Sequence, residues 1–148
     1  MDPTKFPAFQ TYALFATGLC LFSMALDGAA ATFRAKTKTT LNTEDAGTTS
    51  KGAEVVEEER ASVARANRAW RNAFANIVPF LFVAWLYVLT GAAAKSALIY
   101  FGVFAGARLM HAIVYLAGKQ PWRTLMFVIG QLCTIGLAVQ VIRHALAS

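Results

Sequence analysis

The apolar segments of this sequence are long enough to cross a lipid bilayer, and this limits the folds open to the chain. Three of them carry no charged side chain: residues 6–26, 73–94 and 124–142. As a helix, about 20 residues cross the roughly 30 Å of hydrocarbon in a bilayer. A fourth segment, 96–118, has the same length but carries Arg108 and His111, so that face must turn toward protein or water.

The fold predicted from these segments is all-α, an integral membrane bundle of four helices. We expect a single domain over residues 1–148, because the chain is 57% hydrophobic and only 15% charged, too apolar for a water-soluble fold of this size. The expected spans are approximately 6–32, 68–94, 96–118 and 122–145.

The first segment also resembles a secretory signal peptide, since small residues at 28–31 follow an apolar run. A retained helix is the preferred interpretation, because the run is long, the N-terminal residues have no net charge and further spans follow. Cys20 and Cys133 fall inside spans without the spacing of a disulfide framework or metal site, so the sequence predicts no metal.

The positive charges are distributed unevenly along the chain. Ten of the fourteen Lys and Arg residues lie in the connections after the first and third spans: Arg34, Lys36, Lys38, Lys51, Arg60, Arg65, Arg68, Arg71, Lys119 and Arg123. By the positive-inside rule both connections face the cytoplasm and both termini face away from it. A net charge of +6 therefore indicates membrane orientation, and no nucleic-acid partner is expected.

The connection after the first span differs from the other two because it is long and polar. We expect a cytoplasmic loop over approximately 34–54, followed by a helix that begins near Glu54 and projects from the membrane as a charged stem. The acids at 57–59 would favour the positive N-terminal end of that helix. Pro79 removes one of its backbone hydrogen bonds, which predicts a kink.

Three spans carry a stripe of polar or aromatic residues at helical spacing. These are Arg65, Arg68, Asn72 and Asn76; Arg108, His111 and Tyr115; and Arg123, Phe127 and Gln131, with Thr124 beside the last stripe. The simpler interpretations are a solvated basic stem for the first stripe and an interfacial anchor for Arg123. Arg108 needs an acidic, carbonyl or water partner, and Asp27 is one candidate. Together the stripes predict a site for a polar, partly anionic ligand at the cytoplasmic side.

Four segments resemble one known family in order along the chain. They are Arg34 with Asn42, Glu44, Asp45 and Ala46; RANRAWRNAFANIVPF at 65–80; GARLMHAIVYL at 106–116; and QPWRTLMFVIGQ at 120–131. The chain thereby resembles the MAPEG family of membrane proteins in eicosanoid and glutathione metabolism, which includes microsomal glutathione transferases and microsomal prostaglandin E synthase.

The resemblance implies a homotrimer with glutathione, a co-substrate, bound between subunits near the cytoplasmic face. The residues that would line or support this site are Arg34, Arg71, Asn72, His111, Tyr115, Arg123, Thr124 and Gln131. The arginine matching Arg123 is the thiolate-stabilising group of the family, and catalytic roles proposed there for an aspartate and a hydroxyl would fall on Asp45 and Thr124. The thiolate would attack a lipophilic electrophile or hydroperoxide arriving from the membrane.

The sequence departs from the family pattern in the second helix. Ala73 and Ala75 replace two acids, and Trp70 replaces a histidine, so Arg108 lacks its expected acidic partner and Asn76 or Asp27 would compensate only in part. Phe127 stands where prostaglandin E synthase has a tyrosine, so prostaglandin synthesis is not expected.

The leading hypothesis is thus a glutathione transferase, with peroxidase activity as a variant of the same chemistry. The alternatives are a lipid-binding scaffold of the same family without catalysis, which Ala73 and Ala75 favour, and a channel or transporter subunit, which the intramembrane Arg108 and His111 favour. A bacterial inner membrane is expected in preference to endoplasmic reticulum, because the sequence ends at Ala147 and Ser148 without a retention signal.

Overall fold

Four long helices make up most of the protein. The structure is a computed structural model that describes residues 2 and 5–147. The long helices are α1 (Phe9–Thr37), α3 (Ala61–Leu89), α4 (Ala94–Leu116) and α5 (Trp122–Ala147), and each is long and apolar enough to cross a membrane. The predicted all-α fold with four apolar helices is confirmed.

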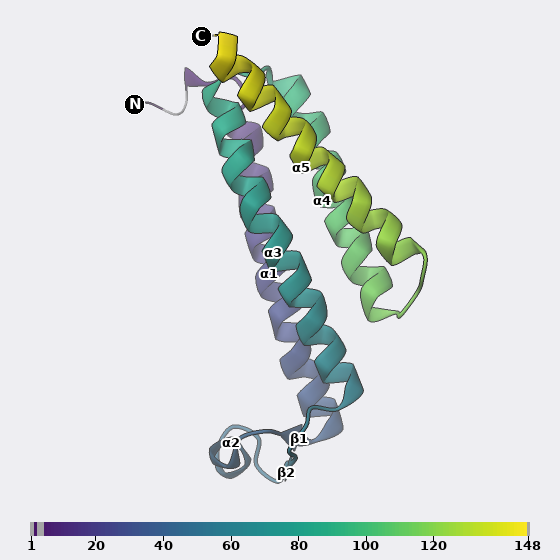
Figure 1. Ribbon diagram of the computed structural model, residues 1–148. Helices are drawn as coiled ribbons and strands as arrows, with labels where there is room; N and C mark the ends of the chain where they lie inside the picture. Colours follow the sequence, from purple (N-terminus) through teal and green to yellow (C-terminus); the bar gives the residue numbers. More distant parts are fainter. Residues whose placement is uncertain (1, 3–4, 148) are drawn as a thin grey trace.

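The helices form two antiparallel pairs that lie side by side (Figure 1). Helix α3 contacts the other three long helices, α1 packs on α3 and α4, and α5 packs on α3 and α4. Within the described residues α1 and α5 do not contact each other. The start of α1 and the end of α5 lie at one end of the molecule, as four crossings require, and the α1–α3 connection lies at the other end (Figure 1).

The connection between α1 and α3 is more ordered than a polar loop. Strand β1 (Thr39–Thr40) pairs in parallel with β2 (Glu54–Val55), and the short helix α2 (Thr43–Gly47) lies between them in the sequence. The amides of Glu54 and Val56 donate to the carbonyl oxygens of Lys38 and Thr40, both at 2.9 Å.

Two boundary predictions for this region are therefore wrong. Helix α1 continues three residues past Arg34, so the connection occupies residues 38–60 instead of 34–54. The second long helix begins at Ala61 and not near Glu54, because the strand pairing uses the backbone groups at 54–56. The acids at 57–59 precede the helix instead of occupying its first turn.

One of these acids, Glu59, joins the end of α1 to the start of α3. Its carboxylate forms an ion pair with Arg34 on α1 and accepts a hydrogen bond of 2.6 Å from Nδ2 of Asn67 on α3. Only 16% of the Glu59 side chain is exposed, so this pair is better shielded than the exposed pair between Arg60 and Glu54. Glu59 thereby fixes the start of α3 against the end of α1.

Aromatic rings fill the interior between α1, α3 and α4. The rings of Phe80 and Phe104 stack at 3.6 Å between centroids, and Phe101 meets Phe80 edge-on at 5.8 Å. All three side chains are buried. Nearer the loop, small residues replace the rings, since Ala30 packs on Val63 and Ala66, which lets the backbones of α1 and α3 approach closely.

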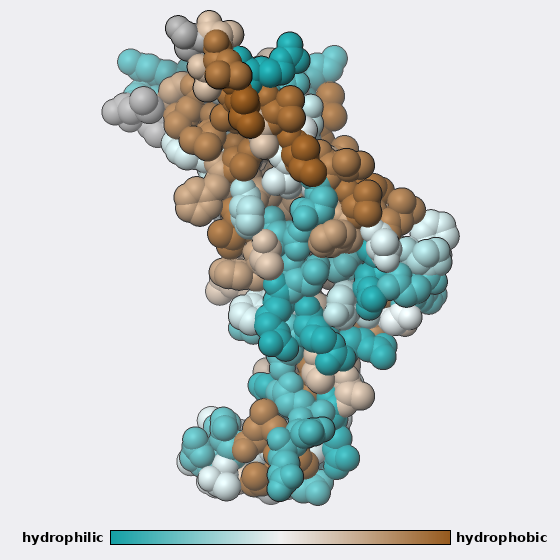
Figure 2. All heavy atoms as spheres, in the orientation of Figure 1, coloured by the Kyte–Doolittle hydropathy of each residue, from teal (hydrophilic) through white to brown (hydrophobic). Residues whose placement is uncertain are grey.

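The surface divides into an apolar part and a hydrophilic part along the helices. Figure 2 shows hydrophobic side chains over the part of the molecule near the termini and hydrophilic ones over the lower part of α3 and the loop. Leu14, Met24 and Phe82 are each more than two-thirds exposed in the protomer, as lipid-facing side chains would be.

We expect Phe80→Ala to destabilise the protein by about 3 kcal/mol, at the low end for truncation of a core phenylalanine, because lipid is as apolar as the interior and mainly packing is lost. Reversible unfolding in mixed detergent micelles measures this change. Phe82→Ala, at a 70% exposed position on the same helix, is the matched control and should change stability much less. Equal effects of the two substitutions would contradict the aromatic core described here.

We expect Glu59→Ala to loosen the connection, because it removes the acceptor shared by Arg34 and Asn67. Trypsin should then cleave the solubilised protein after Lys38 and Lys51 several-fold faster than it cleaves the wild type. Glu58→Ala removes an exposed carboxylate beside Glu59 and should leave the rate unchanged. Identical cleavage rates for wild type and Glu59→Ala would show that the ion pair does not restrain the connection.

Candidate functional site

Helices α4 and α5 bring together four of the expected site residues: His111, Tyr115, Arg123 and Thr124. Arg108, His111 and Tyr115 follow spacings of three and four on α4, so they share the helix face that meets α5. His111 is 3% exposed, and its ring lies 5.6 Å from the Tyr115 ring and 6.3 Å from the Phe127 ring of α5. The imidazole thus lies between an aromatic residue of each helix.

Arg123 lies at the start of α5 and is held from two directions. Its guanidinium carbon stands 4.8 Å from the centroid of the Tyr115 ring, a cation–π contact. With the amide of Gln120 turned so that its oxygen faces Arg123, this oxygen accepts from Nε at 3.1 Å and from Nη2 at 2.6 Å. The amide nitrogen of Gln120 then faces the hydroxyl of Thr124 at 3.2 Å. Gln120 therefore links the two residues expected to act on the thiol.

Arg108 finds its partners in the backbone of α5. Its Nη2 donates to the carbonyl oxygens of Met126 and Phe127 at 3.3 and 3.1 Å. The expectation that Asp27 or Asn76 compensates its charge is wrong: Asp27 is exposed on α1, and Asn76 donates to the carbonyl oxygen of Asn72 at 2.7 Å. Arg34 pairs with Glu59 and Arg60 pairs with Glu54, so neither of these acids is the partner of Arg108.

Helix α3 brings Arg71 and Asn72 to the depth of this cluster. Arg65 Nη1 donates to the carbonyl oxygen of Leu116 at 3.4 Å, and α3 runs antiparallel to α4, so Asn72 lies about two turns further on, near the depth of Arg108. Arg71 is exposed. The side-chain oxygen of Asn72 is buried and has no hydrogen-bond partner within the described part of the chain.

Arg34 and Asp45 lie apart from the other expected site residues in one protomer. Arg34 is paired with Glu59 and borders a polar cavity of about 480 Å³ that Lys38 and Lys51 also line. Asp45 lies in α2, where its carboxylate accepts from Asn42 at 3.0 Å and from Thr49 at 3.3 Å. Figure 1 shows α2 well separated from the turn between α4 and α5.

The remaining expected residue, Gln131, is half-buried on α5, two helical turns beyond Thr124. The protomer thus places Gln131, Thr124 and Arg123 along α5. It does not bring Arg34 or Asp45 to them.

The helices that carry this cluster, α3, α4 and α5, are positively charged. From residue 61 onward the sequence contains eight Lys and Arg residues and no Asp or Glu. The basic cluster on α3, α4 and α5 therefore has no carboxylate of these helices to neutralise it, which suits an anionic ligand. No group of three or more His, Cys, Asp or Glu side chains capable of holding a metal ion occurs in the described residues.

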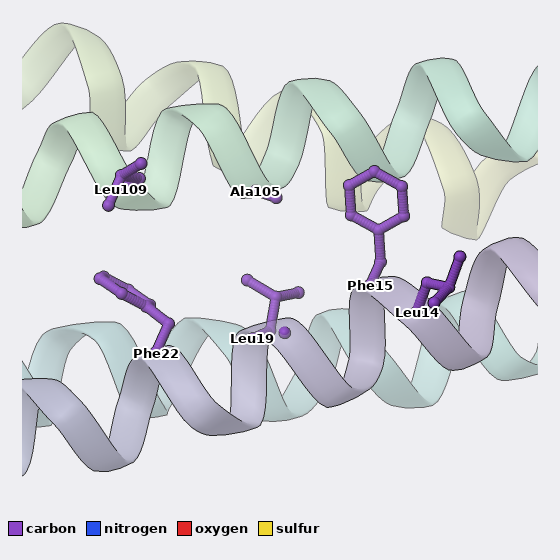
Figure 3. Close-up of a pocket in the computed structure, with 7 residues that line it drawn as sticks. Leu14, Phe15, Leu19, Phe22, Ala105 and Leu109 are labelled. Atoms are coloured by element: carbon purple, nitrogen blue, oxygen red, sulfur yellow. The ribbon is translucent and has the colours of Figure 1, made fainter.

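An apolar groove runs along the boundary between α1 and α4 (Figure 3). Its volume is about 340 Å³, and its lining is almost wholly apolar. The lining residues are Leu14, Phe15, Gly18, Leu19 and Phe22 of α1 with Ala105 and Leu109 of α4. Because Arg108 and His111 face α5, the groove lies on a different face of α4 from the polar cluster.

Two residues of the site are not evident from the sequence pattern. Gln120 lies in the turn before α5, three residues before Arg123 and four before Thr124, and this spacing is the signal for its role. Gly130 lies against the Arg108 guanidinium, since a Cβ there would stand 2.5 Å from Nη2. The sequence signal for this role is the position of the glycine, which follows Arg123 by seven residues and therefore lies on the same face of an apolar helix.

Comparison with known proteins gives a consistent assignment over nearly the whole chain. Microsomal glutathione S-transferase 1 of Rattus norvegicus is 37% identical over 99% of this chain and 94% of its own length, and the Homo sapiens protein of that name is 35% identical over the same shares. Prostaglandin E synthase of Canis lupus familiaris is 34% identical over 56% of this chain and 55% of its own length. With its four apolar helices and the MAPEG family model matching residues 11–143, this multi-pass membrane protein belongs to the MAPEG family.

Proposed function

We propose that the protein is a glutathione-dependent transferase in which Arg123 stabilises the glutathione thiolate. The observation that supports this most directly is the fixed position of Arg123, stacked on Tyr115 and bound by the Gln120 oxygen, in a helical region without carboxylates. Tyr115 and Arg123 are only partly buried in the protomer, so a ligand can reach both side chains. The names of the relatives give the same reaction class.

A fixed guanidinium is the group that thiol activation requires. A thiol of pKa about 8.5 is mostly protonated at neutral pH, and only the thiolate is nucleophilic. Lowering that pKa by two units requires about 2.7 kcal/mol of preferential stabilisation of the thiolate. A charge-assisted hydrogen bond in a site partly shielded from water supplies an energy of this order.

The other basic and polar residues would bind the rest of glutathione. Arg71 is suited to a carboxylate because its planar guanidinium offers two parallel donors. His111 and Gln131 provide further polar groups on the two helices that flank Arg123, and the unpaired side-chain oxygen of Asn72 suits the ligand's amino group. The Thr124 hydroxyl, held near Arg123 through Gln120, would assist at the sulfur.

We further propose that the site is completed by a second copy of the chain in a homotrimer, at the cytoplasmic face. Arg34, in the last turn of α1, and Asp45, in α2, belong to the expected site, but α2 and the end of α1 lie away from the start of α5 within one protomer (Figure 1). A neighbouring copy can present its own Arg34 and α2 to the α4–α5 face, where the basic cluster lacks acids.

The reaction itself needs no covalent bond to the protein. In conjugation the thiolate sulfur attacks an electrophilic carbon of a lipophilic substrate and displaces its leaving group. In peroxide reduction the sulfur attacks the terminal oxygen, the O–O bond breaks to give an alcohol, and a second glutathione converts the sulfenic acid to a disulfide and water. Both reactions use the same bound thiolate, and the protein contributes proximity and charge.

A lipid-binding scaffold without catalysis is the second candidate, and the apolar groove between α1 and α4 favours it. Its volume of about 340 Å³ lies in the range of small-molecule sites, and its walls suit an acyl chain. Such a scaffold would bind lipid whether or not glutathione is present.

The first test is the ultraviolet thiolate absorbance of glutathione added to the detergent-purified protein at neutral pH. We expect a saturable thiolate signal in the wild type and its loss in Arg123→Ala, because the guanidinium that favours the ionised sulfur is removed. Arg143→Ala removes an exposed arginine near the opposite end of α5 and is the matched control. If glutathione binds to the wild type without ionising, or does not bind, the transferase proposal is wrong and the scaffold is favoured.

Sharing of the site between copies can be tested by co-expressing Arg34→Ala and Arg123→Ala chains. Each variant alone should be inactive, but a site that takes Arg34 from one copy and Arg123 from the next would be intact in about one quarter of interfaces in a random mixture. Conjugating activity near a quarter of wild type is therefore expected. No recovery above the separate variants would place both arginines in one chain's site, and native mass spectrometry should show three protomers.

A further inference from the structure

Arg108 is the bulkiest fully buried side chain of the described part of the protein, with 1% exposure. Its two hydrogen bonds both come from Nη2 and both end on carbonyl oxygens of α5, while Nε and Nη1 find no partner within the described residues. The guanidinium also lies between two rings, 5.6 Å from the centroid of Phe104 and 5.5 Å from that of Phe127. Its contacts therefore join α4 to the second turn of α5.

This arrangement depends on the absence of a side chain at Gly130. A Cβ there would stand 2.5 Å from Nη2, 2.8 Å from Nε and 2.9 Å from Cζ of Arg108, all closer than real Cβ contacts. The guanidinium thus lies flat against the backbone of α5. Gly130 follows Phe127 by three residues and Arg123 by seven, so all three lie on the face of α5 that meets α4.

Few residues of α5 are fully buried. Of the 26 residues of α5, only Gly130 and Leu137 are buried, and Leu137 lies in the half of the helix away from Arg123. The contact between Arg108 and the α5 backbone is a buried polar restraint on how the first turns of α5 are rotated and placed, and the contacts of Phe127 with His111 and of Arg123 with Tyr115 add to it. Arg123 lies one turn before the carbonyl groups that Arg108 binds.

We propose that Arg108 is a positioning residue for Arg123, and that the missing side chain of Gly130 leaves room on α5 for the Arg108 guanidinium. By binding the Met126 and Phe127 carbonyl oxygens, Arg108 fixes the rotation of α5 that directs Arg123 onto Tyr115 and toward the thiol. The inference rests on the proposed thiolate chemistry for its functional consequence. Its structural part, that Arg108 fixes the rotation of α5, rests on the contacts alone.

A purely stabilising role predicts a different result. A buried arginine with unsatisfied N–H groups pays desolvation without full compensation, so replacing it by an apolar residue of similar length is often neutral for stability. We therefore expect Arg108→Met to remain folded, with an unfolding midpoint close to wild type, while the bound glutathione loses most of its thiolate. Arg108→Lys can reach the same carbonyls and should restore part of the signal.

Gly130→Ala tests the proposal with both arginines present, because the added methyl group displaces the guanidinium. Hydrogen exchange of the amides at 123–131 should become faster, although alanine favours helix over glycine and by itself would slow exchange. The pKa of the bound thiol should rise by about one unit, which from about 6.5 lowers its thiolate fraction at neutral pH about threefold and weakens binding by no more than about the same factor. Gly102→Ala, whose Cβ would meet its nearest atom at an ordinary 3.8 Å, is the control for both measurements.

Combining Gly130→Ala with Arg123→Ala decides whether Arg108 acts through Arg123. We expect the pKa of the bound thiol in the double variant, read from thiolate absorbance over a range of pH, to equal that in Arg123→Ala alone, because the displaced guanidinium has nothing left to position. Additive losses, unchanged exchange in Gly130→Ala, or unfolding of Arg108→Met would each overturn the proposal. Absence of a thiolate signal in the wild type would instead refute the proposed function, and hydrogen exchange, which needs no glutathione, would still judge the structural inference.

Discussion

The contact between the Arg108 guanidinium and the carbonyl oxygens of α5 determines how the polar half of this protein is built. A charged side chain in a bilayer has to find protein or water, and here the partners come from a neighbouring backbone instead of from an acid. Because the guanidinium lies flat on Gly130, α4 and α5 are held in one register. His111, Tyr115, Phe127 and Arg123 then meet as consequences of that register.

The use of a carbonyl partner also has an electrostatic consequence. A carboxylate beside Arg108 would neutralise it, whereas a carbonyl group leaves its full positive charge in the site. At the end of the molecule that carries the α1–α3 connection, the acids of the described residues lie in the connection itself, where Glu59 and Glu54 pair with Arg34 and Arg60. The acids thus stabilise the connection, and the positive charge of the helices remains available to an anionic ligand.

The two faces of α4 have different chemical characters. One face presents the buried cation and the imidazole to α5, and the other borders the apolar groove with α1. A charged co-substrate from water and an apolar molecule from lipid would therefore approach this helix from different sides within one protomer. In the proposed trimer, a neighbouring copy would bring the two reactants together.

The sequence by itself determined the features that depend on local chemistry. Four apolar segments predict four helices because in lipid the backbone must satisfy its own hydrogen bonds, and the polar stripes on α4 and α5 follow from helical periodicity. A connection between α1 and α3 was predicted, but its boundaries were wrong and its strand pairing was not predicted. Residues 39–40 and 54–55 are only two residues long each, too short for a periodic signal.

Only the tertiary structure decided which groups meet. From the sequence, the partner of Arg108 could be Asp27, Asn76 or a carbonyl group. In the structure Arg108 donates to the carbonyl oxygens of Met126 and Phe127, because α4 packs closely on α5 at Gly130. Likewise, Arg34 and Asp45 match the family's motif as well as Arg123 does, yet the fold separates them from it. A motif fixes the residue types along one chain, whereas distances between helices depend on packing, and packing is not encoded in the spacing of any single segment.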